Sequence, residues 1–339
     1  MIPQEKSEAV ARALRETFGV AEFEEIGAMK KVQALVLVFR IVVRGTPYLL
    51  RIILRKDGPE RHYVNMRAAA EAGIAPRVWY TSVPDKISIT DFVEAVPFST
   101  GEARVRIPVA LRTLHGLAPF APVPHHINTT CMFLMNKSPA LDGFVVKFRE
   151  ANLLPKAETE ELFARLAQLE AAYPRREADM VSSHNDLKPE NLVFDGRRAW
   201  LVDWEAAFWN DRYNDLAVMA NFIAGDEAEE LAYLREYFGR APSEYELARF
   251  YVMQQIVHLF YTMGYMLIGS MGGGVVDGTG EAPEFAAFHR QLWAQEIDLR
   301  DPGNKILYGR VHWRRFLENM QRGRLEEALR VVSGGPRGD

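Results

Sequence analysis

Polar side chains with related chemistry lie close together in one short stretch of the chain. Asp186, Lys188 and Asn191 come first, and Asp203 follows after two apolar runs. A few carboxylate and carboxamide oxygens on flexible loops suit Mg²⁺ that is shared with phosphate groups better than a closed protein cage. A carboxylate that does not bind the metal can orient a hydroxyl group and accept its proton. These residue types therefore indicate a reaction at a phosphate group.

A β-hairpin is needed to bring these side chains together. An Asp-Gly pair at residues 195–196 separates two apolar runs, which is typical of a tight hairpin turn. In an antiparallel hairpin with this turn, Asn191 and Asp203 lie at the same end. Asp186 comes just before that end. We therefore expect the two carboxylates and the carboxamide to converge.

Composition narrows the class of protein. The 339 residues are 48% hydrophobic and 25% charged, with a formal net charge of -4, which excludes a disordered chain and a coiled coil. The slightly acidic balance disfavours nucleic-acid binding through a broad basic face. Cys131 is the single cysteine, which excludes a disulfide framework, and the longest apolar run (residues 256–271) is too short to cross a membrane. We therefore expect a cytoplasmic protein with a small-molecule partner and no nucleic-acid or membrane partner.

The elements that must position these residues divide into two parts. Residues 20–95 predict a β-rich unit, in which apolar runs at residues 32–43 and 47–54 flank a break containing Gly45, as in a hairpin. This part also contains predicted helices at residues 4–17 and 60–72 and predicted strands at residues 78–80 and 87–93.

The second part predicts mainly helices, joined to the first by a hinge at residues 93–98. Ser243 and Glu246 match a capping box ahead of the apolar run at residues 247–266. We expect the polar tail, residues 323–339, to fray. Further helical patterns lie at residues 109–115, at residues 158–173 and over most of the chain from residue 215, and a Gly-rich candidate lid spans residues 269–280.

The pattern H-x-D-x-x-x-x-N, which runs from His184 to Asn191, is followed by an Asp-aromatic-acid triplet at residues 203–205. Together they resemble the aminoglycoside phosphotransferase and choline kinase superfamily, relatives of the protein kinases. Residues 204–217 closely resemble the bacterial choline/ethanolamine kinase branch. Upstream matches lie at residues 50–52, 68–76, 89–92 and 111–115, so the resemblance covers roughly residues 20–225.

The resemblance implies a two-lobed, protein-kinase-like α+β fold. An antiparallel sheet with one helix forms the N-lobe, residues 1–95, and the mainly helical C-lobe spans residues 96–339. ATP and Mg²⁺ lie in the cleft between the lobes of such proteins. The implied reaction transfers the γ-phosphoryl group of ATP to a hydroxyl of a small molecule, for which an amino-alcohol such as choline or ethanolamine is the first choice.

The resemblance also implies roles for individual residues. Asp186 is the expected catalytic base or orienting group, and Asn191 and Asp203 are the expected Mg²⁺ ligands. Arg51 is expected to pair with the phosphates, where many relatives use Lys. The remaining implied roles are Lys188 near the transferred phosphoryl group, His184 bracing the loop, Gly27 in the phosphate loop, and backbone groups of Asp91, Phe92, Val93 and Glu94 against adenine.

The acceptor site is less well defined by sequence. Glu205 is a candidate contact for a cationic group, with a structural salt bridge as the alternative. Aromatic side chains at Trp204, Trp209 and Tyr261 are candidates for a cation-binding cage, although aromatic residues on a buried helix more often belong to the core. His125-His126 is interpreted as an exposed loop pair because no third metal ligand follows at suitable spacing.

Three departures from the family pattern keep other readings open. The phosphate loop has one glycine, followed by Lys30 and Lys31. His62 occupies the usual place of the glutamate that pairs with the strand base, with Glu60 nearby, and Ala95 replaces the hinge glycine. Alternatives are an aminoglycoside, thiamine, homoserine or sugar acceptor, or a non-catalytic nucleotide-binding protein. The sequence leaves the acceptor, the Arg51 partner and the oligomeric state open.

Overall fold

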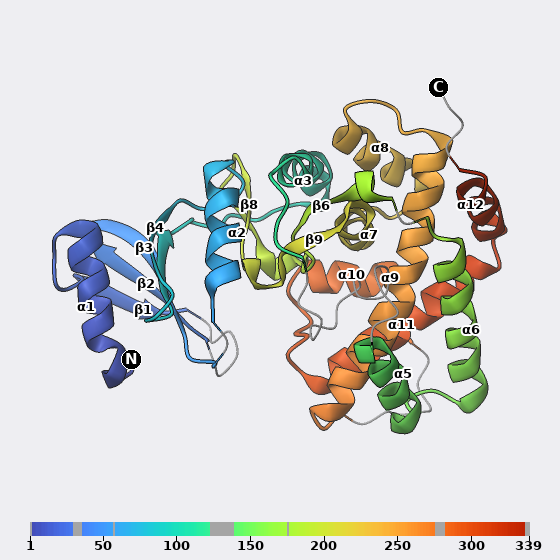
Figure 1. The fold of residues 1–339 in the computed structure, drawn as a ribbon, viewed down its shortest axis with the longest axis horizontal. Coiled ribbons are helices and arrows are strands. Elements are labelled where there is room, and N and C mark those ends of the chain that lie inside the picture. The colour runs from blue at the N-terminus through green and yellow to red at the C-terminus, as the bar shows by residue number, and fades with distance from the viewer. Residues whose placement is uncertain are drawn as a thin grey trace.

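A five-stranded antiparallel sheet forms the N-terminal part (Figure 1). The structure is a computed structural model that describes residues 2–29, 36–56, 58–122, 139–174, 176–274 and 282–335. The strands, in order across the sheet, are β1 (Glu25–Ala28), β2 (Val36–Val43), β3 (Thr46–Ile53), β5 (Ile87–Asp91) and β4 (Val78–Ser82), accompanied by the helices α1 (Gln4–Phe18) and α2 (Glu60–Glu71).

Alternation along β3 determines what each face of the sheet does. Leu50 and Ile52 are fully buried and belong to a small core with the apolar face of α1. Arg51 lies between them and therefore points to the opposite face, toward the rest of the chain. Arg44 and Gly45 adopt positive φ angles of 51° and 72° at the tight β2–β3 turn, where glycine carries no steric cost.

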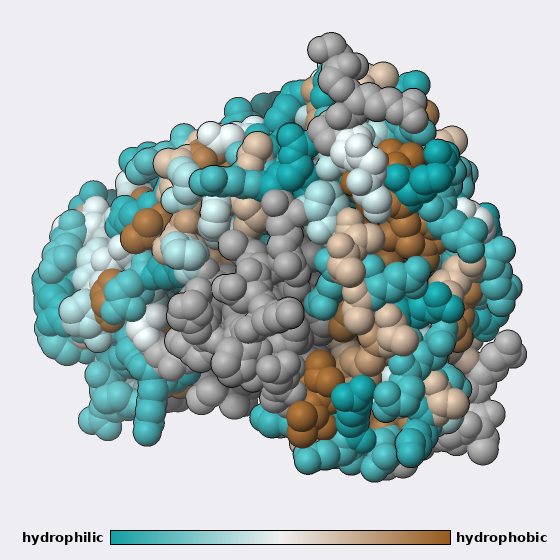
Figure 2. Space-filling view, turned by 45° about the vertical axis from the view of Figure 1, so that its right-hand side comes forward, coloured by the Kyte–Doolittle hydropathy of each residue, from teal (hydrophilic) through white to brown (hydrophobic). Residues whose placement is uncertain are grey.

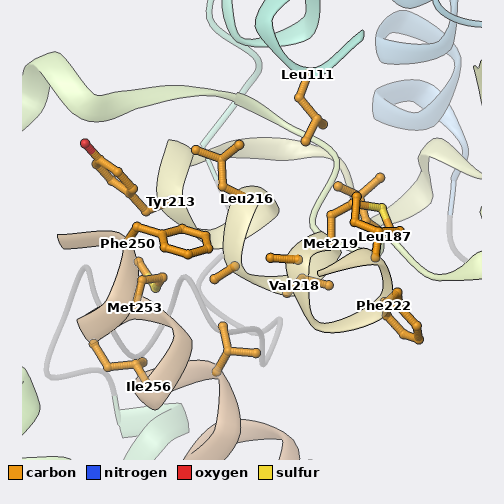
Figure 3. Close-up of a cluster of buried hydrophobic side chains, with 14 of the residues drawn as sticks. Leu111, Leu187, Tyr213, Leu216, Val218, Met219, Phe222, Phe250, Met253 and Ile256 are labelled. Atoms are coloured by element: carbon orange, nitrogen blue, oxygen red, sulfur yellow. The ribbon is translucent and has the colours of Figure 1, made fainter. Parts of the chain in front are cut away.

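Helices form most of the C-terminal part. Its longest helix, α9, is apolar on nearly all sides and is buried among its neighbours α11, α7 and α12. Figure 3 shows the contact between α7 and α9, with Leu111 from α3 and Leu187 close by. The helices are α3 (Thr100–His115), α5 (Pro139–Ala151), α6 (Lys156–Ala172), α7 (Arg212–Ile223), α8 (Glu227–Phe238), α9 (Glu244–Met271), α10 (Phe285–Trp293), α11 (Pro302–Met320) and α12 (Arg324–Ser333).

Two short hairpin-like pairs of strands lie between the sheet and the helices. Strand β6 (Met180–Ser183) pairs with β9 (Phe208–Asp211), and β7 (Leu192–Phe194) pairs with β8 (Ala199–Leu201). The β7–β8 hairpin turns at the Asp-Gly pair, as the sequence predicts, so this prediction is confirmed. The 3₁₀ turn η1 (Glu177–Asp179) precedes β6, and the 3₁₀ turns η2 (Pro189–Asn191) and η3 (Trp204–Ala206) connect β6 to β7 and β8 to β9.

The predicted fold class is confirmed, but several element boundaries differ. Helix α3 begins at Thr100 and not at residue 109, because Ser99 and Glu102 form a capping box and Pro108 is accommodated inside the helix. The expected capping box at Ser243 is present, but α9 continues to Met271. The prediction that the tail frays is wrong for residues 324–333, which form α12 and bury Leu325, Ala328 and Val332.

The surface is mixed in character. Figure 2 shows hydrophobic residues on this face of the molecule lying among hydrophilic ones. No helix among the described residues combines the length and the apolar character that crossing a membrane requires.

Candidate active site

Asp215, near the N-terminal end of α7, anchors the loop that carries Asp186. Its carboxylate accepts hydrogen bonds from the backbone N–H groups of His184 (2.8 Å) and Asn185 (2.9 Å). His115 contacts it through Nε2 at 3.3 Å and contacts the Tyr237 hydroxyl through Nδ1. Burial raises the pKa of Asp215, but the contacts with His115 and the loop outweigh it and hold that pKa below its usual value.

Asp186, Lys188 and Asn191 meet at one carboxylate. Asn191 donates from Nδ2 to the backbone oxygen of Asp186 (2.7 Å) and to its Oδ2 atom (2.9 Å). The ammonium group of Lys188 lies 2.9 Å from the same Oδ2 atom. Burial lowers the pKa of Lys188, but the charge of Asp186 outweighs it, so the pKa is raised and the lysine stays charged. The sequence-predicted cluster is therefore assembled around Asp186.

Asp203 lies immediately beyond β8 and pairs with the sheet. Arg51 donates from Nη1 to Asp203 (2.9 Å) and from Nη2 to Glu205 (3.0 Å). Arg55 adds a second contact to Glu205 at 2.7 Å. Asp203 has a positive φ of 66°, a conformation that Asp tolerates better than most residues and that recurs at functional sites. Burial raises the pKa of Asp203, and the charge of Arg51 outweighs that effect, so the carboxylate stays ionised.

His62 faces this ion-pair cluster from α2. It is 4% exposed, and neither ring nitrogen has a hydrogen-bond partner among the described residues. Ligand atoms of His62, Asp203 and Glu205 all lie within 4.8 Å of one another. Burial and the charge of Arg51 lower the pKa of His62 to about 3, so the imidazole is neutral. No hydrogen bond joins Arg51 to Glu60 or His62; its described partners are the two acidic residues beyond β8.

The predicted hinge offers unused backbone donors. The Asp91 N–H donates to Arg77, and the Asp91 carboxylate accepts from Trp79 at 2.6 Å, so Asp91 is held in place by its neighbours. The Val96 N–H donates to Phe194. Between these positions, at residues 92–95, no backbone N–H donates to another described residue. Phe92, Val93 and Glu94 therefore lie in a segment with donors available for a ligand.

A group of tyrosines lies on the C-lobe side of the catalytic loop. On α9, the rings of Tyr261 and Tyr265 lie 5.2 Å apart, and the Tyr265 ring lies 4.7 Å from that of Tyr308 on α11. Burial raises the pKa of Tyr265, and the nearby charge of Lys188 acts in the opposite direction. The group is therefore within electrostatic reach of the lysine beside Asp186.

The other candidate substrate residues have different surroundings. Trp204 is 1% exposed, packs 4.8 Å from the ring of His184 and donates to the Leu201 carbonyl oxygen, which places it in the core. His184 contacts the Val202 carbonyl oxygen at 2.9 Å, so its ring points into the loop. Trp209 lies half-buried on β9.

Several predicted positions are only partly described. Gly27 lies inside β1, opposite Arg40, and not in a turn. The phosphate-loop residues Lys30 and Lys31, the pair His125-His126 and the second half of the candidate lid, residues 275–280, lie outside the described residues. Sequence reasoning missed Arg55, Tyr265 and Tyr308; the basic residue two positions past β3 and the helical spacing of the tyrosines were the available signals.

The donor set fits Mg²⁺. Asp203 supplies an ionised carboxylate beside the loop, and Asn191 uses its Nδ2 atom toward Asp186, which leaves its carboxamide oxygen for another partner. Oxygen ligands of this kind are those that Mg²⁺ takes when phosphate oxygens complete its shell. The Nε atom of Arg51 is buried and has no partner among the described residues, a donor that a phosphate oxygen can satisfy.

A model of the phosphotransferase enzyme family matches residues 39–251, a region that contains strands β3, β5 and β4, the predicted hinge and the loop from His184 to Asn191. The chain belongs to this family. A comparison with curated protein sequences finds no match. The family membership identifies the chain as a phosphotransferase.

Solved structures share the fold of this phosphotransferase. A choline/ethanolamine kinase family protein from Mesorhizobium loti is 19% identical, with a TM-score of 0.66, and the match covers 97% of this chain and 100% of that one. Choline kinase LicA from Streptococcus pneumoniae is 13% identical, with a TM-score of 0.55 and coverage of 86% and 98%. A spectinomycin phosphotransferase in complex with ADP and spectinomycin is 11% identical, with a TM-score of 0.53 and coverage of 89% and 97%. These likenesses establish the fold.

Proposed function

We propose that this phosphotransferase moves the γ-phosphoryl group of ATP to the hydroxyl group of a small amino-alcohol, with Mg²⁺ bound at Asn191 and Asp203. The observation that carries the proposal is the convergence at Asp186. One carboxylate oxygen faces both a charged lysine and the asparagine that follows it in the loop. Phosphoryl transfer needs positioned charge more than covalent chemistry, and this cluster supplies positioned charge.

The nucleotide is assigned to the space between the hinge and the catalytic loop. Free backbone N–H groups at residues 92–95 suit the adenine edge, and Arg51 suits the phosphates because its guanidinium group offers several donors in a fixed plane. Mg²⁺ bound at Asp203 and Asn191 neutralises phosphate charge. His62 stays neutral at physiological pH and adds no positive charge that would compete with Arg51.

In the proposed reaction Asp186 orients the acceptor hydroxyl and accepts its proton. The hydroxyl oxygen forms a bond to the γ-phosphorus, the bond from that phosphorus to the β–γ bridging oxygen breaks, and ADP leaves. Lys188 stabilises the negative charge on the transferred group and is already held 2.9 Å from Asp186. Asp215 accepts a hydrogen bond from the backbone at the start of this loop, and the ring of His184 contacts the Val202 carbonyl oxygen at the other side of the loop.

The amino-alcohol is proposed because aromatic rings face the loop from the acceptor side. Tyr261 and Tyr265 are half-buried and present electron-rich faces, which attract an ammonium or quaternary ammonium group; Tyr308 is fully buried and packs against Tyr265. Two of the similar structures are those of a choline/ethanolamine kinase family protein and a choline kinase. Glu205 is a weaker candidate for the cation, since Arg51 and Arg55 already occupy its carboxylate.

The test is ATP consumption with Mg²⁺ and a panel of choline, ethanolamine, thiamine, homoserine, an aminoglycoside and a sugar. We expect choline or ethanolamine to stimulate turnover. Asp186→Asn is expected to lower kcat by about 10²–10⁴-fold, the range for loss of a general base. Asp195→Asn, in the hairpin turn of the same segment, is the matched control and is expected to retain kcat.

Three other outcomes test separate parts of the proposal. Stimulation by another member of the panel alone would retain the kinase and reject the amino-alcohol. ATP binding without turnover on any acceptor would favour a non-catalytic nucleotide-binding protein. Turnover that survives in Asp186→Asn would reject the assignment of the base.

A further inference from the structure

A cavity of about 460 Å³ lies in the C-terminal part. Its wall is formed by the end of α7, the start of α8, one stripe of α9 and the last turns of α11. Tyr251, Gln254 and His258 line it from α9, and Arg315 and Asn319 line it from α11. A volume of this size accommodates a small organic molecule.

The cavity is separate from the proposed catalytic site. Tyr251 and His258 lie on the same stripe of α9 as Tyr261, but Tyr251 is ten residues away, or about 15 Å along the helix axis. Between the two ends stands a partition in which His258 contacts His312 at 2.9 Å and the Phe285 ring lies 5.2 Å from His258. The His312 ring lies 5.0 Å from that of Tyr261 and does not line the cavity, so it stands between the cavity and the tyrosines.

Positive charge converges on this cavity. Arg315, Arg322 and Arg324 line it from α11, the following turn and α12. Arg315 has only a loose contact with Glu318, at 3.8 Å, and the Arg322 side chain has no ion-pair partner among the described residues. Arg324 stacks over the Tyr251 ring at 4.0 Å. Arg322 is therefore available to an anion, and Arg315, which also lies over the Phe285 ring at 5.3 Å, holds its carboxylate only at long range.

The carboxylates that line the same cavity are already engaged. Asp226 caps α8 by accepting from the Glu229 N–H at 2.8 Å. Glu230 accepts from Gln254 (2.9 Å) and from Arg324 (2.9 Å). Glu227 lies 3.4 Å from Arg324, and 73% of its side chain is exposed. Glu227 and Glu230 therefore pair with Arg324, whereas Arg315 and Arg322 form no ion pair with a carboxylate that lines the cavity, among the described residues.

Two buried polar groups in the wall of the cavity have no hydrogen-bond partner among the residues that the structure describes. The Tyr251 hydroxyl and the Asn221 Nδ2 atom have no hydrogen-bond partner among the described residues, and these residues are only 4% and 7% exposed. Burial and the charge of Glu230 raise the pKa of Tyr251, while the charges of Arg324, Arg315 and Arg322 act in the opposite direction. Buried polar groups without partners are rare and call for an explanation such as a ligand.

We propose that this cavity binds a small phosphate monoester through Arg315 and Arg322, with the Tyr251 hydroxyl and the Asn221 amide donating to the same group. Arginines and neutral donors that converge from several elements match the many acceptor oxygens of a phosphate. The site is independent of the proposed transfer reaction, because it shares no residue with the cleft.

The test is calorimetric binding of glycerol 3-phosphate and inorganic phosphate at fixed ionic strength, with succinate as a dianion that lacks phosphate. We expect the phosphates to bind and succinate to bind at least about tenfold more weakly. The double variant R315Q/R322Q is expected to weaken phosphate binding at least about 30-fold, since each charge-assisted contact carries a substantial share of affinity. Tyr251→Phe keeps the ring and is expected to weaken it about fivefold.

Two controls locate the binding. Arg330→Gln, an exposed arginine of α12 that pairs with Glu327, is expected to leave phosphate affinity unchanged. Arg51→Gln removes the arginine of the proposed cleft and so detects phosphate that binds there instead. Circular dichroism of R315Q/R322Q checks that the variant is folded. Absence of phosphate binding, equal binding of succinate, or loss of binding in Arg51→Gln with retention in folded R315Q/R322Q would each overturn the proposal.

Discussion

Replacing Asp215 by asparagine tests whether this buried carboxylate holds the catalytic loop. The carboxylate is 1% exposed and accepts from two backbone N–H groups while His115 donates to it. Asparagine keeps one acceptor oxygen and presents its NH₂ group to one of the donors. An unsatisfied buried donor costs about 1–3 kcal/mol and the loss of charge from the remaining contacts about 1 kcal/mol more, so we expect a loss near 3 kcal/mol.

The assay is urea denaturation of the wild type, Asp215→Asn and Asp195→Asn. Asp195 is the matched control, because it also accepts from two backbone N–H groups, at 2.8 and 2.7 Å, and from a ring donor, the Trp200 Nε1 atom. Water reaches its exposed turn and replaces lost contacts, so Asp195→Asn is expected to cost less than about 1 kcal/mol. Equal losses in the two variants would refute the reasoning from burial.

The difference in unfolding free energy between wild type and Asp215→Asn should also depend on pH, which gives a second check. The contacts of Asp215 outweigh burial and hold its pKa below the value of an unfolded chain, about 3.9. Its contribution is therefore complete above about pH 4 and disappears as pH falls through the lower folded pKa. The difference in unfolding free energy between wild type and Asp215→Asn should shrink on acidification below pH 4. A difference that grows there would contradict the assigned direction.

Two further predictions concern the packing of the helical part. In urea denaturation, Gly309→Ala is expected to lower the free energy of unfolding by about 2–3 kcal/mol, because its Cβ would lie 2.4 Å from Met266 on α9. Gly264→Ala, which has open space around its Cβ, is expected to raise the free energy of unfolding by about 0.5–1 kcal/mol. An unchanged stability of Gly309→Ala would contradict the close α9–α11 contact. Arg249→Met leaves Asp211, 2.7 Å from Arg249, as an unpaired buried carboxylate and should cost about 3–5 kcal/mol by thermal denaturation. An unchanged melting temperature would show that this ion pair contributes nothing.

The local part of the site follows from sequence because short-range geometry determines it. The Asp-Gly turn fixes the β7–β8 hairpin, and the hairpin register places Leu192 opposite Leu201. Asn191 and Asp203 flank that pair, so their proximity needs no information from elsewhere in the chain. The loop between Asp186 and Asn191 is similarly short, and its internal contacts are confirmed.

The pairing across the cleft does not follow from local sequence. Glu60 and His62 were both reasonable partners for Arg51, since both lie on α2. The structure pairs Arg51 with residues more than 150 positions away in sequence, because the fold places β3 beside the segment that follows β8. The sequence predicts too late a start for α3, at residue 109, for a different reason. Pro108 disfavours a helix locally, but the capping box at Ser99 and the buried face of the helix outweigh this effect.

The ion pairs of the site indicate that ATP and Mg²⁺ bind together in the proposed reaction. Each cation of the site now faces a carboxylate: Arg51 faces Asp203, and Lys188 faces Asp186. A phosphate arriving alone would compete with Asp203 for Arg51, and a cation arriving alone would compete with Arg51 for Asp203. If the phosphate and the metal ion bind together, Arg51 would pair with the phosphate and Asp203 would pair with the metal ion. Glu205 would keep its contact with Arg55. The charge pairing between β3 and the segment beyond β8 therefore favours joint binding over either step alone.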